Sequence, residues 1–281
     1  MGILNTTPDS FSDGGQLRAG EHGSAFRVSV DKALQKAAAM LGEGASIIDV
    51  GGESTRPGAL PVSEQEEIDR VLPVVEALRQ RLDVAVSVDT SRAGVMRAAI
   101  AAGAGLVNDV RALAQAGTAA LLAPRRDVSI CLMHMRGQPE TMQEQVAYED
   151  VVAEVKAFLQ QRIQYCLDAG IERERLIVDP GFGFGKTVAH NYQLLRELAC
   201  FEGLGLPVLV GVSRKSMLGA VTDRAPAQRL AAGIAATTYA LWHGAAIVRT
   251  HDVAETVDAI RVYEALSGVH GSKGCENESK K

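Results

Sequence analysis

One short stretch, residues 176–186, combines a carboxylate, two phenylalanines and three glycines in the order Leu-Ile-Val-Asp-Pro-Gly-Phe-Gly-Phe-Gly-Lys. Its first three residues are apolar without alternation, as in a parallel strand that is covered on both faces. Asp179 stands where that strand ends, because Pro180 has no backbone N–H to continue a β-ladder. A carboxylate beside apolar rings and freely turning backbone suits a flat ligand that carries N–H donors. A tight loop with a capping aspartate is the alternative interpretation.

The same stretch does not fit either of two common phosphate-binding loops. A Walker loop would need a glycine where the chain has Pro180. The dinucleotide fingerprint would need its third glycine where the chain has Lys186. The interpretation as a site for a flat ligand therefore stays open.

Three further polar residues suit a heteroaromatic ring. Asn108 can donate to and accept from an aminopyrimidine edge, and Asp89 can accept from a further ring N–H. Lys215 could donate to a ring carbonyl or nitrogen. Two other interpretations of Lys215 stay open, namely a solvated loop lysine and a Schiff-base lysine.

A second set of residues suits an anion. Arg249 and His251 are alternate residues after an apolar run, so their side chains can reach the same region. Thr55 and Arg56 lie in a loop after another such run, and Asn5 ends the first one. Arginine, histidine and small polar groups together are typical of a phosphate or pyrophosphate site. The spacing of histidines and carboxylates predicts no metal site made by protein alone, so any metal would be Mg²⁺ held mainly by substrate phosphates.

These residues must be positioned by the elements around them, which are short apolar runs that alternate with helical patterns. We expect strands at Met1–Asn5, Ser46–Gly52, Val84–Asp89, Gly105–Asp109, Val128–His134, Leu176–Asp179, Pro207–Ser213 and Ala245–Thr250. We expect helices at Ser24–Glu43, Ser63–Leu82, Ser91–Ala102, Gln115–Ala123, Glu149–Ala169, Ala189–Phe201, Pro226–His243 and Val253–Leu266. Ser63 and Ser91 are the predicted N-caps of two of these helices.

Strict alternation of strand and helix implies a parallel sheet, and eight such units most simply close into a (β/α)8 TIM barrel. A doubly wound open sheet is the alternative. In a barrel the active site lies at the carboxyl ends of the strands, where this chain has a polar residue after nearly every run. We expect one barrel domain at residues 1–266 and a polar, disordered tail at residues 267–281. Two long loops, residues 6–15 and 51–61, are typical of functional lids, and disordered surface loops of the same composition are the alternative.

Composition limits the remaining classes. The chain has 281 residues, of which 47% are hydrophobic and 22% charged, which is ordinary for a globular protein. A net charge of −5 argues against general binding of nucleic acid. No run is long and apolar enough to predict a membrane span, and no basic and apolar leader predicts secretion, so we expect a cytoplasmic protein. The four widely spaced cysteines are expected to be free thiols.

Five motifs together resemble dihydropteroate synthase. They are Asn-Thr-Thr-Pro-Asp-Ser-Phe-Ser-Asp-Gly-Gly at residues 5–15, Ile-Asp-Val-Gly-Gly-Glu-Ser-Thr-Arg-Pro-Gly at 48–58, Asp-Pro-Gly-Phe-Gly-Phe-Gly-Lys at 179–186, Ser-Arg-Lys-Ser at 213–216 and Arg-Thr-His at 249–251. The similarity covers nearly the whole chain. It implies a barrel that condenses 6-hydroxymethyl-7,8-dihydropterin pyrophosphate with 4-aminobenzoate, giving 7,8-dihydropteroate and pyrophosphate in folate biosynthesis.

The resemblance also implies roles for single residues. The pterin would be held by Asp89, Asn108, Met133, Asp179, Phe184, Lys215 and Arg249. Pyrophosphate would be held by Asn5, Thr55, Arg56, Arg249 and His251, with Asn5 as the protein ligand of Mg²⁺ and Asp13 as a further candidate. The 4-aminobenzoate would meet Phe11, Thr55, Pro57, Lys215 and Ser216. The residues expected to act in catalysis are Asp89, Asp179, Lys215, Arg249 and His251.

The chemistry of these groups favours a dissociative, cation-like substitution. Positive charge that develops on the pterin would be stabilised by Asp179 and Asp89 while Arg249, His251 and Mg²⁺ neutralise the leaving pyrophosphate. A pterin-binding methyltransferase barrel, an aldolase-type barrel and a non-enzymatic binding module are the alternatives. The resemblance further suggests sulfonamides as inhibitors and a homodimer formed through barrel helices, with the alanine-rich Leu230–Ala240 as a possible packing face. We expect neither a nucleic-acid nor a membrane partner.

Overall fold

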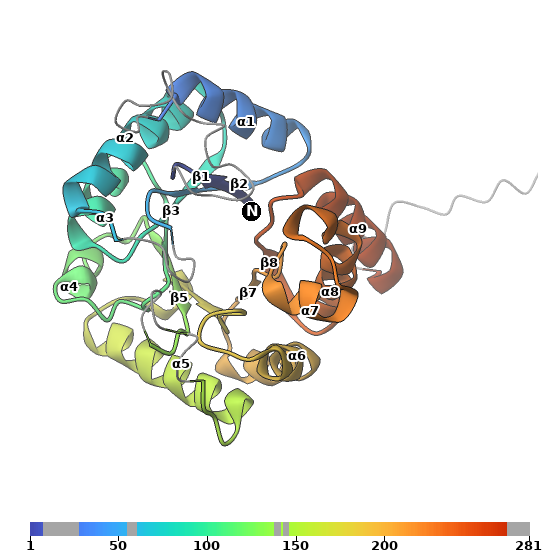
Figure 1. The fold of residues 1–281 in the computed structure, drawn as a ribbon. Coiled ribbons are helices and arrows are strands. Elements are labelled where there is room, and N and C mark those ends of the chain that lie inside the picture. Colours follow the sequence, from blue (N-terminus) through green and yellow to red (C-terminus); the bar gives the residue numbers. More distant parts are fainter. Residues whose placement is uncertain (8–27, 55–60, 138–141, 143–145, 269–281) are drawn as a thin grey trace, which may run out of the picture.

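The eight strands form one parallel sheet that curls into a barrel, and helices surround it (Figure 1). The computed structural model describes residues 1–7, 28–54, 61–137, 142 and 146–268 of the chain. The strands are β1 (Gly2–Asn5), β2 (Ile47–Gly51), β3 (Ala85–Asp89), β4 (Leu106–Asp109), β5 (Ser129–Met133), β6 (Leu176–Asp179), β7 (Val208–Val210) and β8 (Ala245–Val248). Each strand pairs in parallel with the next one along the chain.

The sheet closes between its first and last strands. The amide of Ile3 donates to the carbonyl of Thr250 at 3.0 Å, and the amide of Thr250 donates to the carbonyl of Met1 at 3.0 Å. Gly2 and Thr250 also form an isolated parallel bridge. The predicted (β/α)8 barrel is therefore confirmed, and the alternative of an open, doubly wound sheet is wrong.

The helices of the described residues pack around the outside of the sheet (Figure 1). They are α1 (Val30–Gly42), α2 (Glu64–Arg81), α3 (Ala93–Ala101), α4 (Thr118–Leu122), α5 (Val151–Asp168), α6 (Val188–Arg196), α7 (Ser216–Thr222), α8 (Leu230–Trp242) and α9 (Val253–Ser267). Three 3-10 segments accompany them, η1 (Arg173–Arg175), η2 (Leu198–Leu204) and η3 (Pro226–Gln228).

Several helix predictions need correction. The helix expected from Ser24 begins at Val30, after its N-cap Ser29. The helix expected to reach Phe201 ends at Arg196 and is followed by the 3-10 segment η2. The helix expected from Gln115 begins only at Thr118, because Gly117 before it has a left-handed φ of 82°. The helix expected from Pro226 begins at Leu230, after the separate 3-10 segment η3. Helix α7 was not predicted; it spans seven residues and has no side-chain N-cap, so its sequence carries no start signal.

The two predicted N-caps had different outcomes. Ser63 caps α2 as expected, because its hydroxyl accepts from the amide of Glu66 at 3.1 Å. Ser91 does not cap α3, whose N-cap is Arg92. Its hydroxyl instead donates to the buried carboxylate of Asp109. The Ser91 side chain therefore joins the ends of β3 and β4 and not the start of a helix.

Alternation along the strands fixes which residues point into the barrel. Four buried side chains form a small core inside it, Leu106, Cys131, Ile177 and Leu209, with Ile47 and Ile247 packed against them. Because side chains alternate between the two faces of a strand, residues two positions further on also face the interior. Those residues are Asn108, Met133, Asp179, Asp49 and Arg249, which places the polar strand ends together at one mouth of the barrel.

The last helix of the described residues ends one residue after the predicted end at Leu266, and the domain boundary itself stays a prediction. Helix α9 ends at Ser267, and Gly268 follows with a left-handed φ of 71°. The rest of the predicted tail lies outside the described residues. Of the helices that the structure describes, none is long and apolar enough to cross a membrane.

Candidate active site

Polar side chains from six strand ends meet at the mouth of the barrel. The strand register puts Asp89 beside Asn108 and Met133 beside Asp179. Asn108, Met133 and Asp179 are buried. The charged groups around them fall into two sets. We call these the arginine half, made of Asp49, Asp89, Asn108 and Arg249, and the lysine half, made of Asp179, Lys186 and Lys215.

In the arginine half one guanidinium binds two carboxylates. Nε of Arg249 donates to Oδ2 of Asp49 at 2.6 Å, and its terminal nitrogen donates to Oδ2 of Asp89 at 2.8 Å. Burial alone would lower the pKa of Arg249, but Asp49 and Asp89 outweigh it and raise the pKa above its ordinary value. Burial raises the pKa of Asp89, and Arg249 opposes this rise. Arg249 is therefore a permanent cation that sets the positions of both carboxylates.

Asn108 is oriented by the same aspartate. Its side-chain nitrogen donates to Oδ2 of Asp49 at 3.2 Å, which leaves its side-chain oxygen without a hydrogen-bond partner among the described residues. Oδ1 of Asp49 is likewise buried and unpaired within the part of the chain that the structure describes. A buried acceptor without a donor costs free energy, so these two oxygens suit a ligand that brings N–H groups.

In the lysine half an ammonium group lies over the glycine-rich loop after β6. Nζ of Lys215 donates to the carbonyl of Phe182 and lies 4.9 Å from the centre of the Phe184 ring. Burial lowers the pKa of Lys215 to about 8, although Asp179 opposes this shift. Asp179 accepts from the amide of Gly181 at 2.7 Å; burial raises its pKa, and Lys215 acts in the opposite direction.

The ends of β7 and β8 are joined at the rim. The hydroxyl of Ser213 lies 3.1 Å from Nδ1 of His251, and it also accepts from the His251 amide at 3.2 Å. Next to this contact, the guanidinium of Arg214 donates to both carboxylate oxygens of Asp252. Arg249 lies two residues before His251, so these two members of the predicted anion-binding set stand at the same edge of the site.

Comparisons with known proteins agree with this arrangement. A family model described as pterin binding enzyme matches residues 1–251. The chain is 54% identical over 267 residues to the dihydropteroate synthase of Haemophilus influenzae, which covers 95% of this chain and 93% of that protein. It is 50% identical over 276 residues to the enzyme of Escherichia coli, covering 98% and 94%. The chain belongs to the dihydropteroate synthase family.

Solved structures of the family share the fold at similar identity. A Yersinia pestis dihydropteroate synthase in complex with a sulfonamide drug has a TM-score of 0.89 and 50% identity, covering 95% of this chain and 94% of that one. The Xanthomonas albilineans enzyme in complex with 7,8-dihydropteroate has a TM-score of 0.80 and 41% identity, covering 95% and 92%. A further Xanthomonas albilineans structure contains 4-aminobenzoic acid.

The residues that the family resemblance assigned to the pterin all lie in or beside the two halves. Ser216, assigned to 4-aminobenzoate, is exposed at the start of α7 and directly follows Lys215. Asn5 ends β1, and a side-chain carbon added to Gly51 would lie 3.8 Å from both Oδ1 of Asn5 and Oδ2 of Asp89. The other assigned residues, Phe11, Asp13, Thr55, Arg56 and Pro57, lie outside the described residues.

Mg²⁺ fits this dihydropteroate synthase site only as an ion shared with the substrate. No group of three or more histidine, cysteine or carboxylate side chains suited to a metal occurs among the described residues. The Asn5 side chain offers one amide oxygen at the end of β1, beside Asp89. Mg²⁺ prefers oxygen ligands and is commonly held by one or two protein groups together with substrate phosphates. A single amide oxygen near the anion-binding edge is compatible with that pattern.

Two functional candidates received no role from the sequence. Asp49 interrupts the apolar β2 strand and lies two residues before Gly51, so its parity with the other interior residues could have identified it. Lys186 entered the sequence argument as the last residue of the motif at 179–186, without a role of its own. It is 3% exposed, and its burial is a tertiary feature that the glycine-rich sequence does not reveal.

Proposed function

We propose that the cluster at the barrel mouth carries out the reaction of the chain's family, the synthesis of 7,8-dihydropteroate from 6-hydroxymethyl-7,8-dihydropterin pyrophosphate and 4-aminobenzoate. The observation that carries the proposal is the pair of buried, unpaired acceptor oxygens on Asn108 and Asp49 beside the carboxylate of Asp179. The pterin ring carries an amino group and ring N–H groups along one edge, and these donors match such acceptors.

Pterin recognition uses both halves of the site. Asp179 accepts from the ring N–H and amino pair in a charge-assisted contact, and Asn108 accepts from a further donor. Lys215 donates to a ring acceptor, since its ammonium group lies beside the Phe184 ring that would flank the pterin. Met133 is buried next to Asp179 in the strand register and supplies apolar contact with the ring.

The leaving group departs toward the edge formed by β8 and β1. Arg249 and His251 bind the pyrophosphate oxygens, and Asn5 would hold Mg²⁺ there. When bound, Mg²⁺ supplies positive charge that stabilises the pyrophosphate as it leaves. Arg56 and Thr55, which lie outside the described residues, are proposed to assist on the same side.

The substitution begins with the carbon–oxygen bond between the pterin methylene and the pyrophosphate. As that bond breaks, positive charge spreads into the pterin ring, and the carboxylates of Asp179 and Asp89 stabilise it. The aniline nitrogen of 4-aminobenzoate then forms the new carbon–nitrogen bond and loses one proton to solvent. Because the aniline is uncharged near neutral pH, the reaction requires no strong protein base.

The second substrate enters beside Lys215. Ser216 would meet its carboxylate, and Phe11, Pro57 and Thr55 are proposed to form the wall of this pocket. A sulfonamide shares the aniline group and places a sulfonyl where the carboxylate lies, so sulfonamides are expected to compete with 4-aminobenzoate. The sulfonamide complex of the Yersinia pestis relative supports this expectation.

Pyrophosphate release tests the proposal directly. The full-length protein, supplied with Mg²⁺ and the pterin pyrophosphate, should release pyrophosphate in step with 4-aminobenzoate consumption and 7,8-dihydropteroate formation. A pterin-binding methyltransferase would instead bind the pterin without forming dihydropteroate. If no dihydropteroate forms at saturating concentrations of both substrates, the proposed function is wrong.

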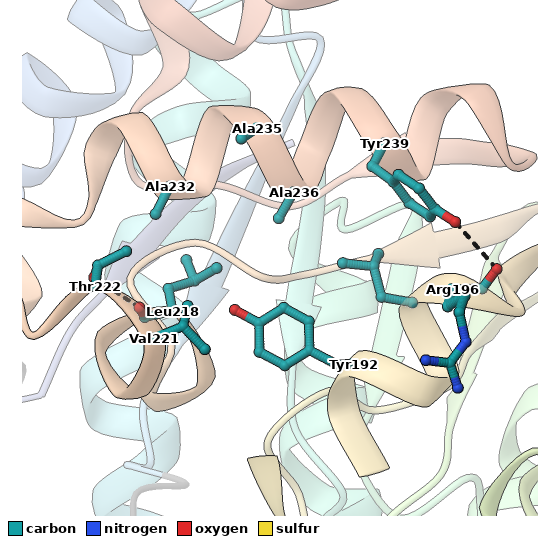
Figure 2. Close-up of a pocket in the computed structure, with 10 residues that line it drawn as sticks. Tyr192, Arg196, Leu218, Val221, Thr222, Ala232, Ala235, Ala236 and Tyr239 are labelled. Carbon is teal, nitrogen blue, oxygen red and sulfur yellow. Dashed lines mark hydrogen bonds between the residues drawn. The ribbon is translucent and has the colours of Figure 1, made fainter. Parts of the chain in front are cut away.

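We also propose a homodimer in which a second copy covers the groove between α6, α7 and α8. The groove has a volume of about 550 Å³, and three alanines of α8 form one wall opposite Tyr192 (Figure 2). Val221 on its rim is 62% exposed. Val221→Glu should shift the protein from dimer to monomer in analytical ultracentrifugation, and an unchanged dimer would exclude this face. The cytoplasmic location also stays a prediction, and the free thiols of the described cysteines Cys131, Cys166 and Cys200 are compatible with it.

A further inference from the structure

Lys186 is a buried lysine that does not touch the proposed ligand positions. Its ammonium nitrogen lies 2.8 Å from the carbonyl oxygen of Gly181, 3.0 Å from that of Phe184 and 3.3 Å from that of His134. It also lies 2.9 Å from Nδ1 of His134. All four neighbours can accept a hydrogen bond, so Lys186 acts as a donor and His134 is neutral with its proton on Nε2. Burial lowers the pKa of His134 to about 2, and Lys186 adds to this shift.

The loop around Lys186 adopts a conformation that only glycine tolerates well. Gly181, Gly183 and Gly185 have φ values of 71°, 82° and 62°. A side-chain carbon on Gly181 would collide with the His134 carbonyl, and one on Gly183 would lie 3.3 Å from the Lys215 chain. Three left-handed residues within the five residues 181–185 do not hold a loop by local preference, so the conformation depends on partners outside the backbone.

Several side chains supply those partners, among them Asp179, Tyr148 and Lys215, which bind Gly181, Gly185 and Phe182. Lys186 and Asn191 each make more than one such contact. Lys186 binds the carbonyls of Gly181 and Phe184. Asn191, on the first turn of α6, accepts from the Gly183 amide at 2.6 Å and donates to the Lys186 carbonyl at 3.3 Å. The loop so fixed presents the Phe182 carbonyl to Lys215 and the Phe184 ring to the pterin position.

Lys186 differs from Asn191 because it also brings a charge near Asp179. The titratable and charged groups that face Asp179 are Lys186 of its own loop, Lys215 after β7, Arg249 after β8 and Cys131 of β5. Lys215, Lys186 and Arg249 all favour the ionised carboxylate against burial. Loss of one of these cations would therefore leave Asp179 easier to protonate.

We propose that Lys186 is a positioning residue for the pterin: its ammonium group fixes the glycine-rich loop, residues 180–186, and brings positive charge near Asp179, so that the loop and this carboxylate can receive the ring. This inference deepens the proposed function, because it assigns the support of the same pterin pocket. Lys186 itself contacts neither substrate.

The test compares Lys186→Met with Asn191→Ala, which loosens the same loop without removing a charge. The affinity for 6-hydroxymethylpterin is measured by calorimetry on the full chain from pH 5 to 8. Both variants should weaken binding, Lys186→Met by about 10- to 100-fold, the scale for groups that misplace a ligand by about an ångström. Pterin affinity should fall at low pH as Asp179 becomes protonated. Only Lys186→Met should shift this fall, the acid limb of the binding profile, to higher pH.

Three results would overturn the proposal. Lys186→Met could bind the pterin as the wild type does, its acid limb could stay unchanged, or Asn191→Ala could move that limb equally. If Lys186→Met does not fold, as judged by circular dichroism, Lys186→Gln takes its place, since it retains two N–H donors without the charge. Pterin binding is measured without 4-aminobenzoate and is therefore independent of turnover. If the wild type binds pterin but makes no dihydropteroate, the proposed function is wrong and the test of Lys186 still applies.

Discussion

The two halves of the site hold their charges in opposite ways. In the arginine half one cation binds two carboxylates directly, and the pKa of Arg249 rises above its ordinary value. In the lysine half two buried cations surround one carboxylate, and the pKa values of both lysines fall. The arginine half is therefore held by direct ion pairs, and it also contains the oxygens of Asn108 and Asp49 that have no hydrogen-bond partner among the described residues. Both halves can change their charge near neutral pH, because burial raises the pKa of Asp89 to about 7 and lowers that of Lys215 to about 8.

The largest effect is expected when the central cation of the arginine half is removed. Arg249→Met leaves two buried carboxylates unpaired, which should reduce the free energy of unfolding by about 3–5 kcal/mol. Urea denaturation at pH 7 measures this. The unpaired carboxylates would have raised pKa values in the folded state, so the folded protein binds more protons than the unfolded one and the loss should be smaller at pH 5 than at pH 8.

A second substitution serves as the control for Arg249→Met. Adding Asp49→Asn removes one of the two unpaired charges and should restore part of the lost stability. Wild-type stability of Arg249→Met, or no recovery in the double variant, would mean that the arginine half is not held by its ion pairs.

The lysine half should respond in binding more than in stability. Asp179→Asn places an amide donor against a ring donor, and the affinity for a pterin fragment should fall by about 2–4 kcal/mol. Asp109→Asn is the matched control, because Asp109 is also buried at a strand end but binds Ser91 and the amides of Arg111 and Leu113. Calorimetry should show pterin affinity retained in that control. Equal losses of pterin affinity in both variants would mean that Asp179 does not contact the pterin.

The contrast between the halves also explains what the sequence could predict. The positions at the predicted strand ends and the family motifs pointed to Asp89, Asn108, Asp179 and Arg249, because the active site of a barrel lies at the carboxyl ends of its strands. The barrel followed from strict alternation of strand and helix. Asp49 was noted as a polar residue of its strand but received no role, since its contacts with Arg249 and Asn108 join residues far apart in the chain.

Other features could not be read from local patterns. The contacts by which Lys186 fixes the glycine-rich loop include the backbone of His134, which directly follows β5 and lies 52 residues earlier in the chain. Helix α7 lacked a capping signal. Ser91 was predicted to be an N-cap, but its hydroxyl donates a hydrogen bond to the buried carboxylate of Asp109. For Lys186 and Ser91 a partner distant in the chain determines which contacts the side chain makes, and local sequence patterns do not reveal that partner.

The pH dependence of the lysine half should be visible directly. Because the pKa of Lys215 is lowered to about 8, the charged donor is lost as the pH rises above that value, and pterin affinity should then fall by up to about tenfold per pH unit. Calorimetry between pH 7 and 9.5 measures this. Lys215→Arg keeps its charge throughout and should give a flat profile, even if its affinity is lower.

Stability offers a second measurement of the same group. The unfolded chain retains the Lys215 proton up to its ordinary pKa of 10.5, whereas the folded protein releases it near 8. The unfolded state therefore binds more protons in that window, so Lys215 makes stability rise with pH there. Lys215→Met should lack this contribution. An identical pH dependence of unfolding in both proteins would contradict a lowered pKa.

The smallest expected effect concerns the ion pair that joins the two halves at the rim. Arg214 directly precedes Lys215, and Asp252 directly follows His251, so their pair ties the loop after β7 to the loop after β8. Arg214 has a left-handed φ of 58°, which is unfavourable for a residue with a side chain. The pair opposes that local cost, and it holds Lys215 and His251, the groups proposed to bind the pterin and the pyrophosphate, in one arrangement.

A double-mutant cycle with Arg214→Ala and Asp252→Ala should therefore give a coupling of about 1 kcal/mol in the affinity for pyrophosphate. The side chains of this pair are only 29% and 17% exposed, so solvent screens their attraction less than at an open surface. The pair Arg261–Asp258 on α9 is the control, because its side chains are 70% and 75% exposed and its cycle should give no coupling. If both cycles give the same value, the rim pair contributes only surface charge, and each half of the site is positioned by its own strands alone.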